Sequence, residues 1–181
     1  LFNNKGDGTF TRITTGPIVS QSNDAIRGSW GDFDNDGDLD LFVANSFYEN
    51  FLYENNGDGS FRRITSGAIV NDDGGSTSCS WGDYDNDGDL DLFVTNNRGE
   101  NNFLYRNNGN GSFTKITSGA IVNDGGSSIS SSWADYDNDG DLDLFVTNDD
   151  NENDFLYQND GNDNHWIDIF CIGTNSNTSA I

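Results

Sequence analysis

The chain has 181 residues, with 31 acidic side chains against 8 basic ones and a net charge of -23. This charge excludes nucleic acid as a partner, because phosphate contacts need lysine and arginine, and it favours cations. Aromatic residues make up 13% of the chain, which argues for a folded protein. No apolar run approaches the ~20 residues that span a bilayer. Cys79 and Cys171 are too few for a disulfide scaffold, and the sequence leaves open whether they pair.

The sequence repeats itself. One signature begins with Leu-Phe or Leu-Tyr at Leu1, Leu52, Leu104 and Leu156. An acidic signature begins at Asp32, Asp83 and Asp135, so successive copies are 51 and 52 residues apart. Periods near this length are typical of propellers and of arrays of small β-units.

Within one period the residue patterns predict four strands and no helix, because alternating and short apolar runs are separated by glycine-rich turns. The predicted segments, in chain order, are strands at 103–108 and 112–117 around a Gly-Asn-Gly turn, a loop at 118–128, and strands at 132–137 and 142–148. Four-stranded units that repeat at this length are blades of the β-propeller type. We expect the recurring Trp30, Trp81 and Trp133, and the recurring tyrosines Tyr53, Tyr105 and Tyr157, to pack between blades.

The sequence therefore predicts an all-β protein of tandem four-stranded β-propeller-type blades, with about three complete blades after a leading hairpin. Closed propellers have roughly 4 to 8 blades, so we expect an incomplete or open propeller. Two interpretations stay open: the chain is a piece of a longer protein, or neighbouring copies complete the structure. Because the chain opens inside a repeat, the sequence leaves open whether a targeting segment precedes it.

The acidic signature predicts a metal site. In Asp-x-Asp-x-Asp-Gly-x-x-Asp, the side chains at positions 1, 3 and 5 turn toward one point, and the glycine at position 6 permits a sharp bend. Position 7 offers its backbone carbonyl, and position 9 closes the shell. Many hard oxygen donors suit Ca²⁺, so we predict about three calcium ions, one in each of loop 1 (residues 32–40), loop 2 (83–91) and loop 3 (135–143). The predicted ligands are Asp32, Asp34, Asp36, Asp38 and Asp40; Asp83, Asp85, Asp87, Asp89 and Asp91; and Asp135, Asp137, Asp139, Asp141 and Asp143.

The loops do not belong to EF-hands. An EF-hand places glutamate at position 12 and flanks its loop with helices, whereas position 12 is Val43, Val94 or Val146 in these loops. Inside the Ser-Trp-Gly-Asp-Tyr-Asp context, the motif resembles FG-GAP and VCBS-type repeats, the blades of integrin α-like propellers. The resemblance covers residues 1–165. The tail from residue 166 to 181 is similar to the start of an ASPIC/UnbV segment of cartilage-acidic-protein-like proteins, and it stops soon after that start.

The resemblance implies a secreted or cell-surface protein, a calcium-stabilised scaffold for adhesion or for binding a protein or glycan ligand, and no enzymatic activity or catalytic residue. Two alternatives stay open: a lectin-like propeller that binds carbohydrate, and a subunit of an extracellular fibre that assembles head to tail. The single histidine, His165, is interpreted as structural. Asn110 and Asn177 match the N-glycosylation sequon, and a turn role explains Asn110 equally well.

Overall fold

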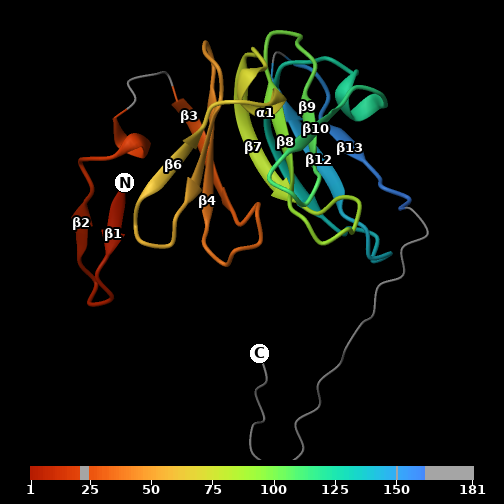
Figure 1. Cartoon of the computed structure of the whole chain (residues 1–181). Helices are drawn as coiled ribbons and strands as arrows, with labels where there is room; N and C mark the ends of the chain where they lie inside the picture. Colours follow the sequence, from red (N-terminus) through yellow and green to blue (C-terminus); the bar gives the residue numbers. More distant parts are fainter. Residues whose placement is uncertain (21–24, 150, 162–181) are drawn as a thin grey trace, which may run out of the picture.

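The computed structural model describes residues 1–20, 25–149 and 151–161 (Figure 1). The described chain is built from antiparallel sheets joined by short loops, as the sequence predicts for an all-β protein. A leading hairpin pairs β1 (Phe2–Asn4) with β2 (Phe10–Arg12). Three sheets follow in chain order, and each has the strand order expected for a meander of neighbouring strands.

The three sheets are the predicted blades. Blade 1 contains β3 (Ala25–Gly31), β4 (Asp40–Asn45), β5 (Phe51–Asn55) and β6 (Phe61–Ile64). Blade 2 contains β7 (Ser76–Gly82), β8 (Asp91–Asn96), β9 (Phe103–Asn107) and β10 (Phe113–Ile116). Blade 3 contains β11 (Ser128–Ala134), β12 (Asp143–Asn148) and β13 (Phe155–Tyr157). A fourth strand of blade 3 would fall on residues outside the described ranges.

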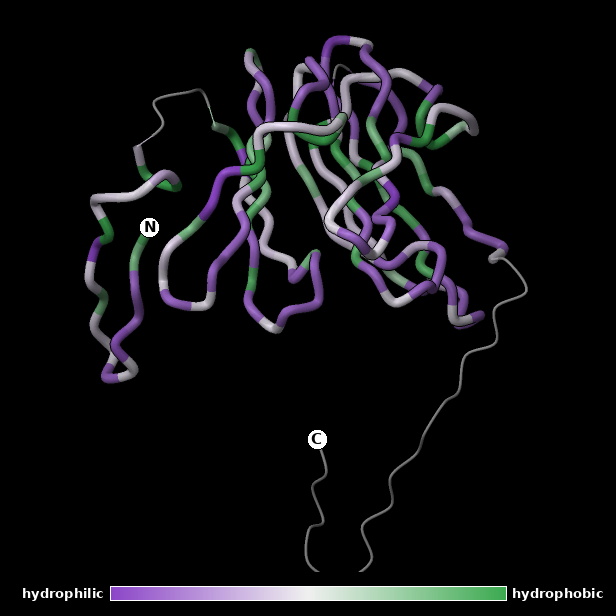
Figure 2. The backbone as a smooth tube through the Cα atoms, in the orientation of Figure 1, coloured by the Kyte–Doolittle hydropathy of each residue, from purple (hydrophilic) through white to green (hydrophobic). Residues whose placement is uncertain are grey.

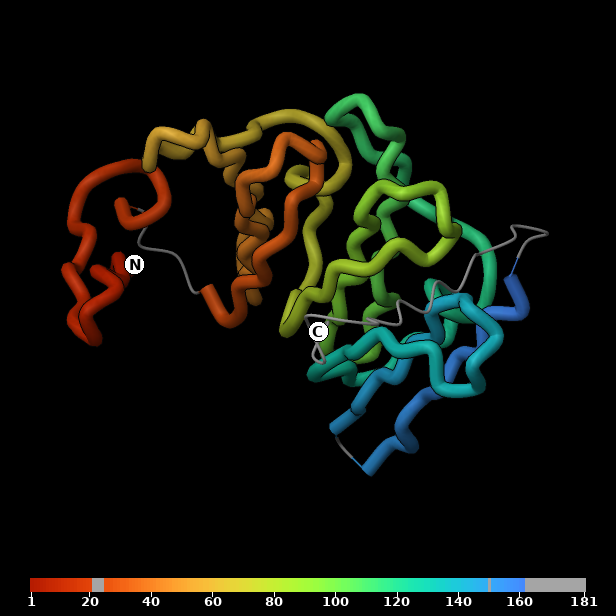
Figure 3. Tube along the Cα trace, turned by 90° about the horizontal axis from the view of Figure 1, so that it is seen from below, coloured from red at the N-terminus to blue at the C-terminus, as the bar shows by residue number. Residues whose placement is uncertain are grey.

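The repeated sequence gives a repeated register. In the first strand pair of each blade, the tryptophan lies opposite a leucine: Trp30 opposite Leu41, Trp81 opposite Leu92, and Trp133 opposite Leu144. Seen from below, the sheets follow one another in chain order around an arc (Figure 3). The first strand of blade 2 contacts the first strands of both neighbouring blades. The described chain is therefore an open arc of blades.

Two apolar clusters lie between the blades. The first joins blades 1 and 2 around Phe42, Leu92 and Trp81, and the second joins blades 2 and 3 around Phe93, Leu144 and Trp133. The Trp81 indole donates a hydrogen bond to the Ser29 carbonyl at 3.2 Å, and Trp133 does the same to Ser80 at 3.3 Å. These contacts confirm the predicted role of two of the three tryptophans. For Trp30 the prediction was wrong, because its side chain is 44% exposed and the leading hairpin supplies only two strands to cover it.

The segment predicted as a loop contains a short helical turn in each repeat. These turns are η1 (Pro17–Val19), α1 (Ala68–Asn71) and η2 (Ala120–Val122). In the second repeat, Ile69 and Val70 are 2% and 3% exposed. Burial of these two side chains also removes the backbone around them from water, and the helical turn supplies hydrogen bonds to that backbone from within the chain. For example, the Asp72 amide donates to the Ala68 carbonyl at 3.0 Å.

Candidate metal centre

The three acidic loops occupy equivalent places in the fold. Each joins the first strand of a blade to the second, so all three lie at the same end of the sheets, the lower end in Figure 1. Hydrophilic segments mark this end of the backbone in Figure 2. The predicted strand at 132–137 ends earlier than expected, at Ala134, because the aspartates that follow bend into the loop.

Each loop is folded by hydrogen bonds to its own carboxylates. In loop 1, the Asp32 carboxylate at position 1 accepts from the amides of Asp36 and Gly37 at 3.1 and 3.0 Å. Loops 2 and 3 repeat both bonds. The glycine at position 6 has φ near +94° in all three loops: Gly37, Gly88 and Gly140. The predicted need for glycine at this position is thus confirmed, since larger residues rarely adopt this conformation.

The aspartate at position 9 is buried and held on both of its oxygens. Asp91 is 0% exposed, and it accepts from the amides of Tyr84 at 3.1 Å and Asn107 at 2.8 Å. Asp40 and Asp143 repeat the arrangement at 0% and 2% exposure. This carboxylate therefore cannot turn away from the loop without losing two backbone partners.

The loops bring their carboxylates together. In each loop three aspartates have carboxylate oxygens within 4.8 Å of one another: Asp32, Asp34 and Asp36; Asp83, Asp85 and Asp91; Asp135, Asp137 and Asp143. The predicted ligands at positions 1 and 3 belong to every cluster, and position 5 or position 9 completes it. In loops 2 and 3 the side chains at position 7 instead contact the preceding blade, where Asp89 and Asp141 accept from the Asn35 and Asn86 amides. In these two loops, position 7 is left with its carbonyl as a ligand.

The clustered carboxylates are electrostatically unfavourable without a cation. Burial raises the pKa of Asp40 to about 6 and that of Asp91 to about 7, and neighbouring aspartates add to both shifts. Burial, followed by repulsion from position 5, also raises the pKa of Asp34 and Asp85. A donor set made only of carboxylate and carbonyl oxygens fits a hard cation such as Ca²⁺. The residues present therefore fit a calcium ion in each loop.

The FG-GAP-like repeat family matches residues 1–43, 32–94 and 83–146. The chain belongs to the FG-GAP-like repeat family. Successive FG-GAP-like matches overlap at residues 32–43 and 83–94. These segments contain loop 1 and loop 2 with the first residues of the strand after each loop, so neighbouring matches share each of these two loops. The search of curated proteins found no match. The proposed ASPIC/UnbV tail lies outside the described residues, so it stays a prediction.

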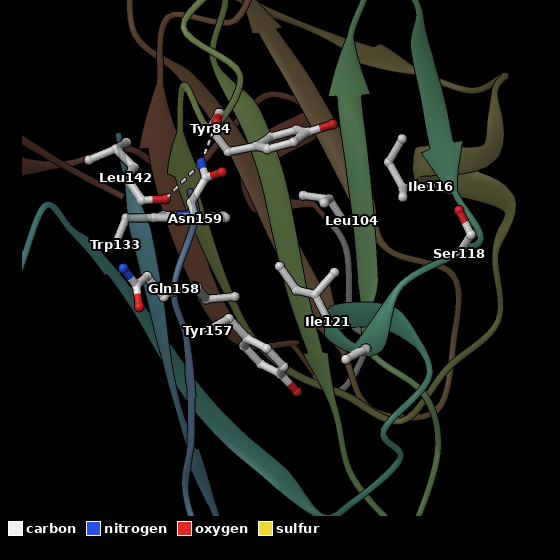
Figure 4. A pocket seen from close by; sticks show the side chains of 12 residues that line it. Tyr84, Leu104, Ile116, Ser118, Ile121, Trp133, Leu142, Tyr157, Gln158 and Asn159 are labelled. Atoms are coloured by element: carbon white, nitrogen blue, oxygen red, sulfur yellow. Dashed lines mark hydrogen bonds between the residues drawn. The ribbon is translucent and has the colours of Figure 1, made fainter. Parts of the chain in front are cut away.

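A cavity of about 380 Å³ lies between blades 2 and 3 (Figure 4). It is lined by aromatic and aliphatic side chains, among them Tyr84, Trp133 and Tyr157. Between blades 1 and 2 the matching space holds Phe113, whose ring lies 5.7 Å from Phe33 and 6.2 Å from Trp81. The repeat spacing of 52 residues puts His165 at the position of Phe113 in the sequence. Since His165 lies outside the described residues, the cavity does not support a ligand site.

Sequence reasoning missed several asparagines that position the loops. Asn35, Asn86 and Asn138, at position 4, have φ between 56° and 63°, a region that asparagine tolerates better than most residues. Asn107 ends β9 and Asn159 follows β13, and both contact the loops. Their recurrence at fixed spacing was the available signal. For Asn110, the Ser112 amide and hydroxyl donate to its side chain at 3.1 and 2.6 Å, so it has a turn role; Asn177 lies outside the described residues.

Proposed function

We propose that each acidic loop binds one Ca²⁺, giving three ions, and that the chain is a calcium-stabilised extracellular scaffold. The observation that carries this proposal is the buried aspartate at position 9. A carboxylate such as Asp91, fixed by two backbone amides and surrounded by further carboxylates, has a strongly raised pKa at about 7. A divalent cation would offset this repulsion. The two ion pairs found among the described residues involve carboxylates outside the loops.

Calcium that binds only the folded protein contributes directly to its stability. At a free concentration ten times Kd, one site adds about 1.4 kcal/mol and three sites add about 4 kcal/mol. Extracellular calcium modules typically have Kd values of about 10⁻⁴ to 10⁻³ M. For a chain of this size, ~4 kcal/mol corresponds to a rise in Tm of roughly 8 to 16 °C.

Calorimetry and thermal unfolding test the proposal. We expect about three bound ions per chain and a large rise in Tm with calcium. The double variant Asp83→Asn, Asp85→Asn should lose one ion. Asp58→Asn is the matched control, because Asp58 is an exposed carboxylate in a hairpin turn, where it accepts from Ser60, and it should leave the stoichiometry unchanged. An unchanged Tm and no binding heat would refute the calcium sites.

Membership of the FG-GAP-like repeat family supports the scaffold role. FG-GAP-like repeats are structural and binding modules that are typically extracellular, and this supports an adhesive or ligand-presenting function without catalysis. None of the helices in the described ranges has the length and apolar character of a membrane-spanning segment. Secretion is tested directly by following the protein in the cells that make it: its appearance in the medium or at the cell surface supports the proposal, and its retention inside the cell contradicts it.

Carbohydrate binding is the second candidate, and one surface favours it. Phe47 and Tyr48, in the loop between β4 and β5, are 58% and 54% exposed. They line a hollow of about 390 Å³ together with Arg98 and Glu100, and the Arg98 guanidinium lies 4.7 Å from the Phe47 ring centre. Aromatic faces beside charged hydrogen-bonding groups suit a saccharide. Glycan-array binding that is lost in Tyr48→Ala would support this candidate, and an array without any binding would count against it.

A further inference from the structure

Neighbouring acidic loops are hydrogen-bonded to each other. The side-chain amide of Asn35, at position 4 of loop 1, donates to the carboxylate of Asp89, at position 7 of loop 2, at 2.7 Å. The amide of Asn86 in loop 2 donates in the same way to Asp141 in loop 3. The two junctions in the described arc thus share one contact between position 4 and position 7 of consecutive loops.

A second asparagine bridges each junction. The Asn107 side chain donates to the carbonyl of Phe33, in loop 1, at 2.6 Å and to that of Leu90, in loop 2, at 3.2 Å. Its backbone amide donates to Asp91 at 2.8 Å. Asn159 makes the matching bonds between loops 2 and 3, and its side-chain bonds to Tyr84 and Leu142 are drawn in Figure 4. At each junction, one asparagine side chain therefore contacts two loops at once.

These bridges join the parts of the loops that a metal ion would order. Position 4 lies between two predicted ligands, and position 7 is the predicted carbonyl ligand. An ion in loop 1 would fix the backbone that carries Asn35 and Phe33, and through them the positions of Asp89 and Asn107. By linkage, order in loop 2 must favour loop 1 to the same extent. This step rests on the calcium binding proposed above.

We propose that Asn35, Asn86, Asn107 and Asn159 couple the calcium sites, so that neighbouring loops bind calcium cooperatively and calcium fixes the angle between blades. Repulsion between the bound ions opposes this coupling. Exposed charges are screened over about 8 Å at 0.15 M salt, whereas the bridges through the buried Asn107 are screened much less. Raising the salt concentration should therefore increase the cooperativity while it weakens the average affinity.

Calcium titration of the whole chain by calorimetry tests the coupling. The wild type should give a Hill coefficient above 1, with an upper limit set by the number of sites. In the double variant Asn35→Gly, Asn86→Gly the coefficient should fall toward 1, because glycine keeps the positive φ but removes one of the two asparagine bridges at each junction. Asn138→Gly is the matched control: it has the same position and φ of 63°, but the described arc has no following loop. It should keep the Hill coefficient of the wild type.

A double-mutant cycle gives a second measurement. Disabling loop 1 with Asp32→Asn and Asp34→Asn should lower the calcium affinity of the remaining loops about fivefold to tenfold, the lower end of typical coupling between sites. The same change should have a clearly smaller effect in the Asn35→Gly background, where only the Asn107 bridge still joins loops 1 and 2. A fold defect would appear in both backgrounds, so the difference between them isolates the coupling.

The outcomes separate the two proposals. Absence of calcium binding would refute the proposed metal sites and the coupling with them. Binding of three ions with a Hill coefficient of 1 at both low and high salt would refute the coupling alone. An equal loss of cooperativity in Asn138→Gly would also overturn it, since that side chain bridges no pair of described loops.

Discussion

Without calcium, the protein should be more stable in mild acid than at neutral pH. The pKa of Asp40 is raised to about 6 and that of Asp91 to about 7 by burial. A carboxylate with a raised pKa in the folded state stabilises the fold fully below its unfolded pKa, near 3.8, and loses this contribution as the pH rises through its folded pKa. The window of lost stability therefore runs from about pH 4 to pH 7.

The size of the effect follows from the two shifts. Between pH 7.5 and pH 5.5, proton linkage gives about 2 kcal/mol from Asp91 and about 1 kcal/mol from Asp40. Together these ~3 kcal/mol should raise Tm by roughly 6 to 12 °C. Saturating calcium should remove this advantage, because the ion binds the ionised carboxylates and competes with protons.

Thermal unfolding of metal-free protein, followed by tryptophan fluorescence at the two pH values, measures the effect. The net charge of -23 adds a general repulsion of the same sign, so the comparison is made in 0.5 M salt, which screens exposed charges. Asp91→Asn should remove about two thirds of the pH dependence. If the metal-free protein is equally or more stable at pH 7.5, the reasoning from buried position-9 carboxylates fails.

Three further outcomes are expected. Gly82→Ala should destabilise the protein by about 1–3 kcal/mol, because its Cβ would lie 2.8 Å from the Trp133 ring; the matched change Ala134→Gly should have less than about 1 kcal/mol of effect in chemical denaturation. Trp81→Ala should cost about 3–5 kcal/mol in the same assay, and a smaller loss would contradict its role between blades. The Cys79 thiol, whose pKa burial raises to about 12, should resist alkylation in native protein, and rapid labelling found by peptide mapping would be inconsistent with this.

The blades and their acidic loops were predictable because the same sequence pattern occurs several times along the chain. A glycine at position 6 and alternating apolar residues act locally, so each copy predicts the same turn between the same strands. For Asp91 the sequence predicted a role as a metal ligand, but it did not predict that the side chain is buried. Its two backbone partners, Tyr84 and Asn107, come from the loop itself and from a strand 16 residues away in the chain, and only the folded sheet brings them together.

Contacts between blades were harder to predict, because they join residues more than 50 positions apart. The bond from Asn35 to Asp89 spans 54 residues, and no local pattern encodes it. Trp30 shows the converse: the sequence around it matches the sequence around Trp81, but the exposure of its side chain depends on which strands lie beside it. Repetition therefore predicts what a blade is, whereas the environment of each copy depends on its place in the arc.

This dependence bears on the fibre alternative. One end of the arc exposes Trp30, and the other exposes Tyr136 and Phe145 at 49% and 43%, the residue types that meet inside the arc. At the far end, however, Ala134 stands where Gly31 and Gly82 make room for the next tryptophan. Its Cβ would fall within the space of an incoming indole ring, so it disfavours the docking of a second copy with the internal geometry. Sedimentation should therefore show no head-to-tail growth, and Ala134→Gly should permit it; filaments of the wild type would overturn this argument.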